Sequence, residues 1–197
     1  MNYRSKNLET MFTAWRELVK SYEAQIDNVK KDQHLSPFGR NEKIKALEAN
    51  LDNEREKAVA MWGKEWEAIK AEYIPHGTSN PSDRTTAMQT IIAIGGEMSV
   101  KMLNDVLEPV KKDVAAIRLL KPIIEKQGLF EAFEQTQAYA LLKSADRVEG
   151  CVAEAEKICK AMANENDYFK WAINKQFMFQ FLEAAEKELD TVRTLEE

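Results

Sequence analysis

The chain has 197 residues, of which 44% are hydrophobic and 31% are charged, and its formal net charge is −5. This hydrophobic content excludes a disordered polymer and is enough for one ordinary domain, or for a small domain with an elongated extension. Residues 1–74 are electrically neutral, so residues 75–197 carry the whole negative charge. Because phosphates attract basic surfaces, we expect no nucleic-acid partner for such a chain.

Sparse turn residues favour long helices. Seven glycines and five prolines are too few for the many turns of a β-rich fold. The first predicted element is an amphipathic helix over residues 5–33, in which apolar side chains recur every three or four residues. These side chains are Leu8, Met11, Phe12, Trp15, Leu18, Val19, Tyr22, Ile26 and Val29.

A second helix is predicted from Pro37 to about Tyr73. Ser36 is expected to cap it, because serine is a favoured cap residue and the next residue, Pro37, suits the first helical position. The N–H that proline lacks would have no partner within the helix there. Because neither helix can bury its apolar stripe alone, residues 1–74 are predicted to form a long antiparallel hairpin that resembles a coiled coil. Its tip is expected to be exposed and mobile, because Leu51 is the only large apolar residue between Asn50 and Lys57. The second stripe consists of Ile44, Leu47, Leu51, Ala58, Met61, Trp62, Trp66, Ile69 and Tyr73.

The clearest boundary in the sequence follows this hairpin. Residues 74–83 contain two prolines, one glycine and several small polar residues, which predicts a linker over residues 75–83. The rest of the chain, residues 84–197, is predicted to form a separate helical bundle. Ser82 or Asp83 is expected to cap its first helix.

The bundle is predicted to contain about five helices, so the fold class is all-α. Gly95 and Gly96 predict a bend, Pro109 and Pro122 predict kinks or short breaks, and Gly128 predicts a helix end. Further helices are expected over residues 130–141 and 145–162. After a polar break at residues 164–167, the last helix is expected over residues 167–195.

No arrangement of residues suits catalysis. His34 and His76 are the only histidines, and each is expected in a turn or linker without a nearby residue to complete a metal site. Cys151 and Cys159 would lie about 12 Å apart along one helix, which is too far for a disulfide, and they are interpreted as small hydrophobes. We therefore predict no catalytic, metal-binding or cofactor-binding residues and no enzyme activity.

The cellular compartment is also expected from sequence. Reduced cysteines are typical of the cytoplasm, and the charged first twenty residues do not resemble a signal peptide. No apolar run approaches the roughly 18 to 20 residues that span a bilayer, so no membrane partner is expected. The sequence predicts a cytoplasmic protein.

Two aromatic clusters exceed what a core requires, and aromatic residues are enriched where proteins bind one another. Trp62 and Trp66 lie one turn apart, and we favour the interpretation that they close the base of the hairpin; the alternative is an anchor for a partner. Phe177 and Phe179 lie about 200° apart around the last helix, so one packing face cannot hide both. That helix is either central in the bundle or part of an oligomer contact. The candidate partner-binding residues are Trp62, Trp66, Phe177 and Phe179.

Residues 35–44, with the sequence LSPFGRNEKI between two charged helices, resemble a turn found in helical proteins of tailed bacteriophages and prophages. Residues 91–124 share this character through Gly95-Gly96 and the segment Leu107-Glu108-Pro109. The resemblance carries no functional residue over to this chain. It implies a phage-encoded protein that acts in the cytoplasm of a bacterial host cell or in virion assembly.

Three hypotheses about function follow. The first is a non-enzymatic protein-interaction protein of assembly or scaffold type, expected to be a homodimer, whose hairpin or last helix contacts other copies or a virion protein. The second is a phage-encoded inhibitor that covers the surface of a host enzyme or defence complex. The third, a hydrolase or metal enzyme, would need a pocket of clustered Asp, Glu and His side chains.

Overall fold

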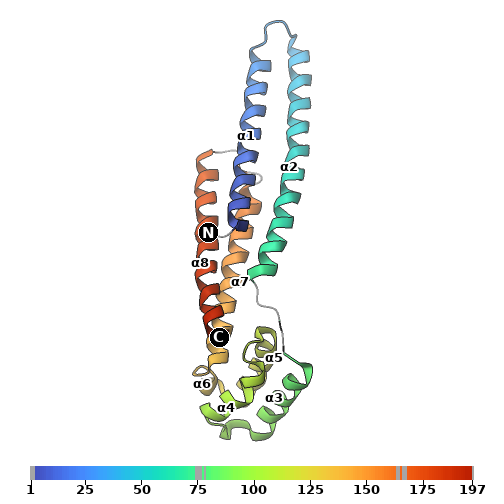
Figure 1. Cartoon of the computed structure of the whole chain (residues 1–197). Coiled ribbons are helices and arrows are strands. Elements are labelled where there is room, and N and C mark those ends of the chain that lie inside the picture. Colours follow the sequence, from blue (N-terminus) through green and yellow to red (C-terminus); the bar gives the residue numbers. More distant parts are fainter. Residues whose placement is uncertain (1–2, 74–76, 78, 163–164, 166–167, 197) are drawn as a thin grey trace. The chain divides into compact units, whose positions relative to one another are not determined.

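A computed structural model of the chain describes residues 3–73, 77, 79–162, 165 and 168–196. Across these residues the regular structure is helical, with eight α-helices, two short 3-10 helices and no strand (Figure 1). This confirms the predicted all-α fold class. The described helices include none with a stretch both long enough and apolar enough to cross a membrane.

The first two helices form the predicted hairpin (Figure 1). Helix α1 spans Tyr3–Lys31 and helix α2 spans Pro37–Tyr73. Ser36 caps α2 as predicted, because its Oγ accepts a hydrogen bond from the Gly39 N–H at 3.1 Å. Just before it, Asp32 tightens the turn by accepting a hydrogen bond from the His34 N–H at 2.8 Å.

Helix α3 (Pro81–Ile94) begins earlier than the sequence predicted. Its cap is Asn80, whose side chain accepts a hydrogen bond from the Ser82 N–H at 3.3 Å. The prediction that Ser82 or Asp83 would be the cap is therefore wrong. The reason is Pro81, which is well accommodated at the first helical position and moves the start upstream. Residues 75, 76 and 78 of the predicted linker lie outside the described residues.

Two glycines and one proline interrupt the helices of the next segment as predicted. Gly95 has φ +61°, a conformation that L side chains rarely adopt, and begins the 3-10 helix η1; Gly128 has φ +73° just after the end of α5. Pro109 marks the break between α4 and α5, whereas Pro122 lies inside α5 without breaking it. Pro122 is exposed, so water can reach the side of the helix that lacks a hydrogen bond. The elements are η1 (Gly95–Glu97), α4 (Val100–Leu107), η2 (Glu108–Val110) and α5 (Val114–Lys126).

Residues 130–162 divide into helices differently from the prediction. Helix α6 spans only Phe130–Phe133, and helix α7 is continuous from Gln137 to Met162, so the expected break between residues 141 and 145 does not occur. Thr136 sets the boundary instead, because its Oγ1 accepts a hydrogen bond from the Tyr139 N–H at 3.1 Å. Helix α8 spans Tyr168–Glu196. Of the polar break predicted at 164–167, only Glu165 lies within the described residues.

The chain groups into two compact units. Unit 1 consists of residues 1–69 and 155–179, and unit 2 consists of residues 70–154 and 180–197. Helices α7 and α8 therefore each contribute to both units. The division predicted from sequence, with a hairpin over 1–74, a linker over 75–83 and a bundle over 84–197, stays a prediction.

Each unit has its own hydrophobic core, but the distal part of the hairpin has none. Unit 2 buries apolar side chains from α3 to α7 together with Val192 of α8. In the hairpin, burial stops at Val19 on α1 and resumes at Ala58 on α2, and every residue from 20 to 57 remains partly or fully exposed. The large apolar side chains buried in unit 1 include Leu8, Phe12, Trp15, Trp62, Trp66, Ile69, Met162, Trp171 and Met178.

Candidate functional site

Trp62 and Trp66 lie in the core of unit 1. Each is 2% exposed. The ring of Trp62 meets the ring of Phe12 edge-on at 4.7 Å between centroids and that of Trp15 at 6.2 Å. The structure thus places both tryptophans as the core interpretation describes, and in this conformation they offer a partner almost no surface.

Phe177 and Phe179 lie on different sides of α8, as their spacing predicts. The ring of Phe179 packs against Phe12 at 6.5 Å, and the ammonium of Lys175 lies 5.9 Å from its centroid. Lys175 also pairs with Glu9 of α1 at 3.0 Å, which ties the start of α8 to the hairpin. Phe177, by contrast, is 50% exposed.

Phe177 belongs to an exposed apolar ridge that the sequence analysis missed. Phe169 is 71% exposed and Ile173 is 36% exposed, and Phe169, Ile173 and Phe177 follow one another at four-residue spacing along α8. The four-residue spacing could have predicted this ridge. Because the helix has apolar residues on most of its circumference, the sequence did not indicate which side faces solvent. The ridge is a candidate contact surface of unit 1.

The two cysteines lie in environments that disfavour the charged thiolate. Burial raises the pKa of the Cys159 thiol to about 11, and burial also raises the pKa of Cys151, so both thiols are poor nucleophiles at neutral pH. His34 is exposed, and His76 lies outside the described residues. Within the described part of the chain, no group of three or more His, Cys, Asp or Glu side chains could hold a metal ion.

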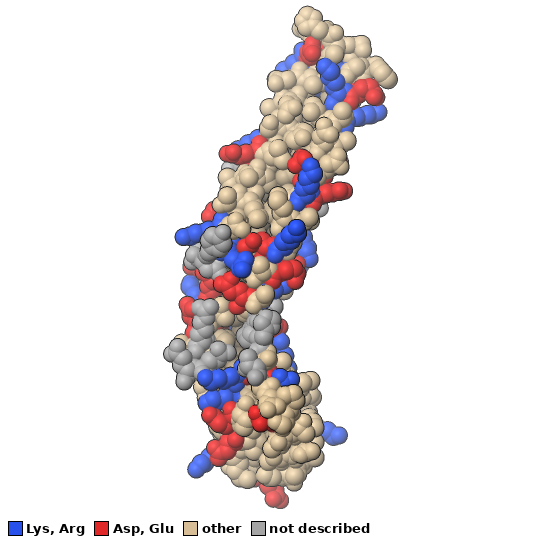
Figure 2. Space-filling view, turned by 45° about the vertical axis from the view of Figure 1, so that its right-hand side comes forward, with Lys and Arg blue, Asp and Glu red and all other residues tan. Residues whose placement is uncertain are grey.

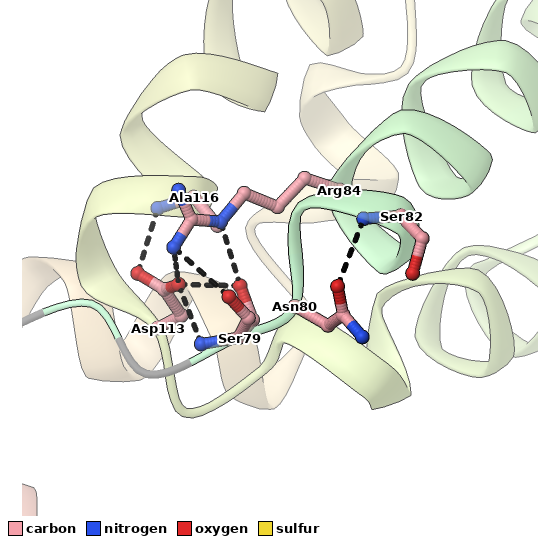
Figure 3. Close-up of polar contacts among 6 residues, drawn as sticks. All are labelled: Ser79, Asn80, Ser82, Arg84, Asp113 and Ala116. Atoms are coloured by element: carbon pink, nitrogen blue, oxygen red, sulfur yellow. Dashed lines mark hydrogen bonds and ion pairs between the residues drawn. The ribbon is translucent and has the colours of Figure 1, made fainter.

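A buried polar cluster in unit 2 surrounds Asp113, which the sequence analysis did not single out (Figure 3). Its carboxylate is 1% exposed and accepts hydrogen bonds from the backbone N–H of Ser79 at 3.0 Å and of Ala116 at 2.9 Å. The Ser79 hydroxyl donates to the same carboxylate, and Arg84 pairs with it at 2.8 Å. Asp113 thereby caps α5 and fixes the segment that leads into α3.

We call Asp113 and its partners Ser79, Arg84 and Ala116 the Asp113 clamp. It stabilises the fold by holding two segments of unit 2 together. Burial disfavours the charged form, but the hydrogen bonds from Ser79 and Ala116 and the charge of Arg84 outweigh it and hold the pKa of Asp113 below its ordinary value. Gly77 approaches so closely that a Cβ there would lie 2.6 Å from Asp113 Oδ1. Four donors and a glycine thus enclose the carboxylate and join the segment before α3 to the start of α5.

The distal hairpin carries a shallow groove of about 390 Å³. It is lined by Gln25, Asn28, Val29, Lys43, Ala46, Leu47 and Asn50. The apolar seam beneath it is only partly buried, because two helices alone cannot enclose their own stripes. The seam consists of Tyr22, Ile26, Val29, Ile44, Leu47 and Leu51.

Charged side chains leave much of this hairpin surface uncovered. Figure 2 shows them along the two sides of the hairpin, in the upper part of the view, with uncharged side chains in the band between them. An uncharged band on a hairpin whose apolar seam is only partly buried is the pattern of a surface that can bury against a protein.

Comparisons with known proteins leave the function to be inferred from these surfaces. No protein-family model matches the chain, and neither a curated protein nor a solved structure shows significant similarity to it.

Proposed function

We propose that this chain is a non-enzymatic protein-interaction protein of assembly or scaffold type, which associates with other proteins through its distal hairpin. The supporting observation is the absence of any buried residue between positions 20 and 57, although six large apolar side chains form the seam there. Burial of apolar surface is worth about 25 cal/mol per Å², so a partner that covers this seam gains affinity from it. Folding within one chain does not provide that burial.

The biological setting belongs to the proposal as well. The likeness of residues 35–44 to a turn of tailed-phage proteins supports a phage-encoded protein in a bacterial host. In that setting, the partner of an assembly protein is another copy of itself or a virion protein.

A second candidate function is inhibition of a host enzyme or defence complex. The exposed ridge of Phe169, Ile173 and Phe177 favours it, because this ridge is a second apolar surface apart from the hairpin seam. A protein with two such surfaces can cover a host target with one of them. The lack of clustered metal-binding side chains in the described residues gives the hydrolase hypothesis no support.

The test combines mass measurement with partner capture. Light scattering across a concentration series should show self-association of the purified chain, and tagged protein should recover copies of itself from a co-expressing cell. A monomer that captures one host protein stoichiometrically would favour the inhibitor instead. A chain that stays monomeric and captures nothing would contradict both functions.

A further inference from the structure

We propose that the partner of the distal hairpin is a second copy of this chain, bound antiparallel, so that the tip of each hairpin lies on the neck of the other. The tip is defined as residues 28–46, and the neck as residues 17–27 together with 47–57. This inference rests on the proposed function and deepens it by naming the partner and the geometry.

The two segments are opposite in charge. The tip has five basic and two acidic side chains, for a net charge of +3, whereas the neck has three basic and seven acidic ones, for a net charge of −4. Ion pairs inside the neck, such as Arg55 with Asp52 at 2.5 Å and Lys57 with Glu54 at 2.6 Å, leave that net charge unchanged. The hairpin is therefore polarised along its length.

This polarity selects one arrangement of two copies. Hairpins that pair tip to tip would bring +3 against +3 and −4 against −4. An antiparallel pair related by a two-fold axis instead places each basic tip on an acidic neck, twice by symmetry. Complementary charge of this kind sets orientation and opposes the wrong register.

The groove lies where the two-fold axis would pass. Asn28, Val29, Lys43 and Ala46 line it from the tip, and Gln25, Leu47 and Asn50 line it from the neck. A second hairpin centred on this boundary would cover the partly buried seam on both sides of it. The surface that needs covering and the charge boundary therefore coincide.

The available area is sufficient for a specific dimer. Tip and neck together contain 15 residues of α1 and 21 residues of α2, or about 22 Å and about 31 Å of helix, and two adjacent helices present a face about 20 Å wide. Such a face would bury roughly 530 Å² per copy, or roughly 1,100 Å² in total, which exceeds the roughly 1,000 Å² that a specific interface needs. The dimer is expected to depend on protein concentration.

Charge reversal tests the geometry. The tip-reversed variant carries Lys31→Glu, Lys43→Glu and Lys45→Glu, and the neck-reversed variant carries Glu23→Lys, Glu48→Lys and Glu56→Lys; all six positions are exposed. These changes turn the tip from +3 to −3 and the neck from −4 to +2. Each variant alone should weaken the dimer about tenfold or more in sedimentation or light-scattering measurements, because like charges then face each other or attraction is lost.

Restoration is the decisive result. The variant that combines all six changes again has tip and neck of opposite sign, and it keeps the net charge of −5, so it should dimerise like the original chain. An equimolar mixture of the tip-reversed and neck-reversed variants should form a heterodimer.

A matched control variant carries three charge reversals at exposed lysines of unit 2: Lys101→Glu, Lys112→Glu and Lys126→Glu. It changes the net charge as much as the tip-reversed variant does, and it should leave the dimer intact. Circular dichroism confirms that each variant remains helical.

The possible failures separate this inference from the function beneath it. If the chain dimerises and the tip-reversed variant dimerises equally well, the antiparallel pairing is wrong while self-association stands. If the variant with all six substitutions does not dimerise, the charges do not act in the proposed pairs and the antiparallel geometry is again wrong. If the original chain is monomeric but captures a virion protein, the second-copy inference fails and the proposed function survives. A monomer without any partner overturns both.

Discussion

Asp113 stabilises unit 2 as an ionised group, and this makes part of the stability dependent on pH. Its folded pKa lies below the ordinary value of about 3.9, so its contribution is fully present above that pH and is lost as the pH falls through the lowered folded value. The original chain should have a larger free energy of unfolding than the Asp113→Asn variant at neutral pH. This difference should shrink as the medium is acidified below about pH 4. Urea unfolding across a pH series measures this gap. A gap that stays constant to the lowest accessible pH would contradict it.

Gly77 should resist substitution although it is exposed. A Cβ at this position would lie 2.6 Å from Asp113 Oδ1, so Gly77→Ala must displace the clamp and should cost roughly 1–3 kcal/mol of unfolding free energy. Gly150 is a matched control in the same unit, because a Cβ there would meet nothing within 4 Å. It lies inside α7, where Gly150→Ala should stabilise by about 0.5–1 kcal/mol. Equal changes in unfolding free energy for Gly77→Ala and Gly150→Ala would contradict the claim that a Cβ at Gly77 displaces Asp113.

Trp62 and Phe177 should respond differently to truncation. Trp62→Ala leaves a cavity among Phe12 and Trp15 and should cost about 3–5 kcal/mol, whereas Phe177 is 50% exposed and Phe177→Ala should cost less than about 1 kcal/mol. Thermal or chemical unfolding of the two variants measures both effects. A large loss for Phe177→Ala would show that its ring supports the core more than its exposure indicates.

At the scale of elements, the sequence predicted helices where a stripe and a cap agreed. Pro37 and Ser36 located the start of α2, and Gly128 located the end of α5. Prediction failed where two caps competed within a few residues, as at Asn80 and Ser82, and where a run of small apolar residues could belong to either of two helices, as around Ala145. The Asp113 clamp was missed because its donors come from Ser79 and Arg84, about thirty residues away in sequence.

Local stability along α1 and α2 should follow the same division of burial. Residues 20–57 lack buried side chains, so their amides should exchange hydrogen faster than those near Trp15 and Trp62 in dilute protein. Because the proposed dimer covers the distal seam, protection there should rise with protein concentration while the core amides stay unchanged. Exchange followed by mass spectrometry at two concentrations measures both effects. Protection that is uniform along the hairpin would contradict the predicted order.

At the scale of the whole molecule, the two units should unfold together. Helices α7 and α8 are continuous, and each supplies residues to both units, so the melting of either helix removes residues from both cores. Calorimetry should show one transition for the original chain. Trp62→Ala in unit 1 and Asp113→Ala in unit 2 should both lower its midpoint. Two separate transitions, each sensitive to one variant alone, would show independent units.

The shared helices also determine when the protein can fold during its synthesis. The hairpin leaves the ribosome before the rest of unit 1, because residues 155–179 are made about a hundred residues later. At a typical rate of about 5–20 residues per second, the rings of Phe12, Trp15 and Trp62 remain without their final packing partners for several seconds. During that interval the apolar side chains of the hairpin are exposed, so we expect chaperones that bind emerging polypeptides to have time to bind it.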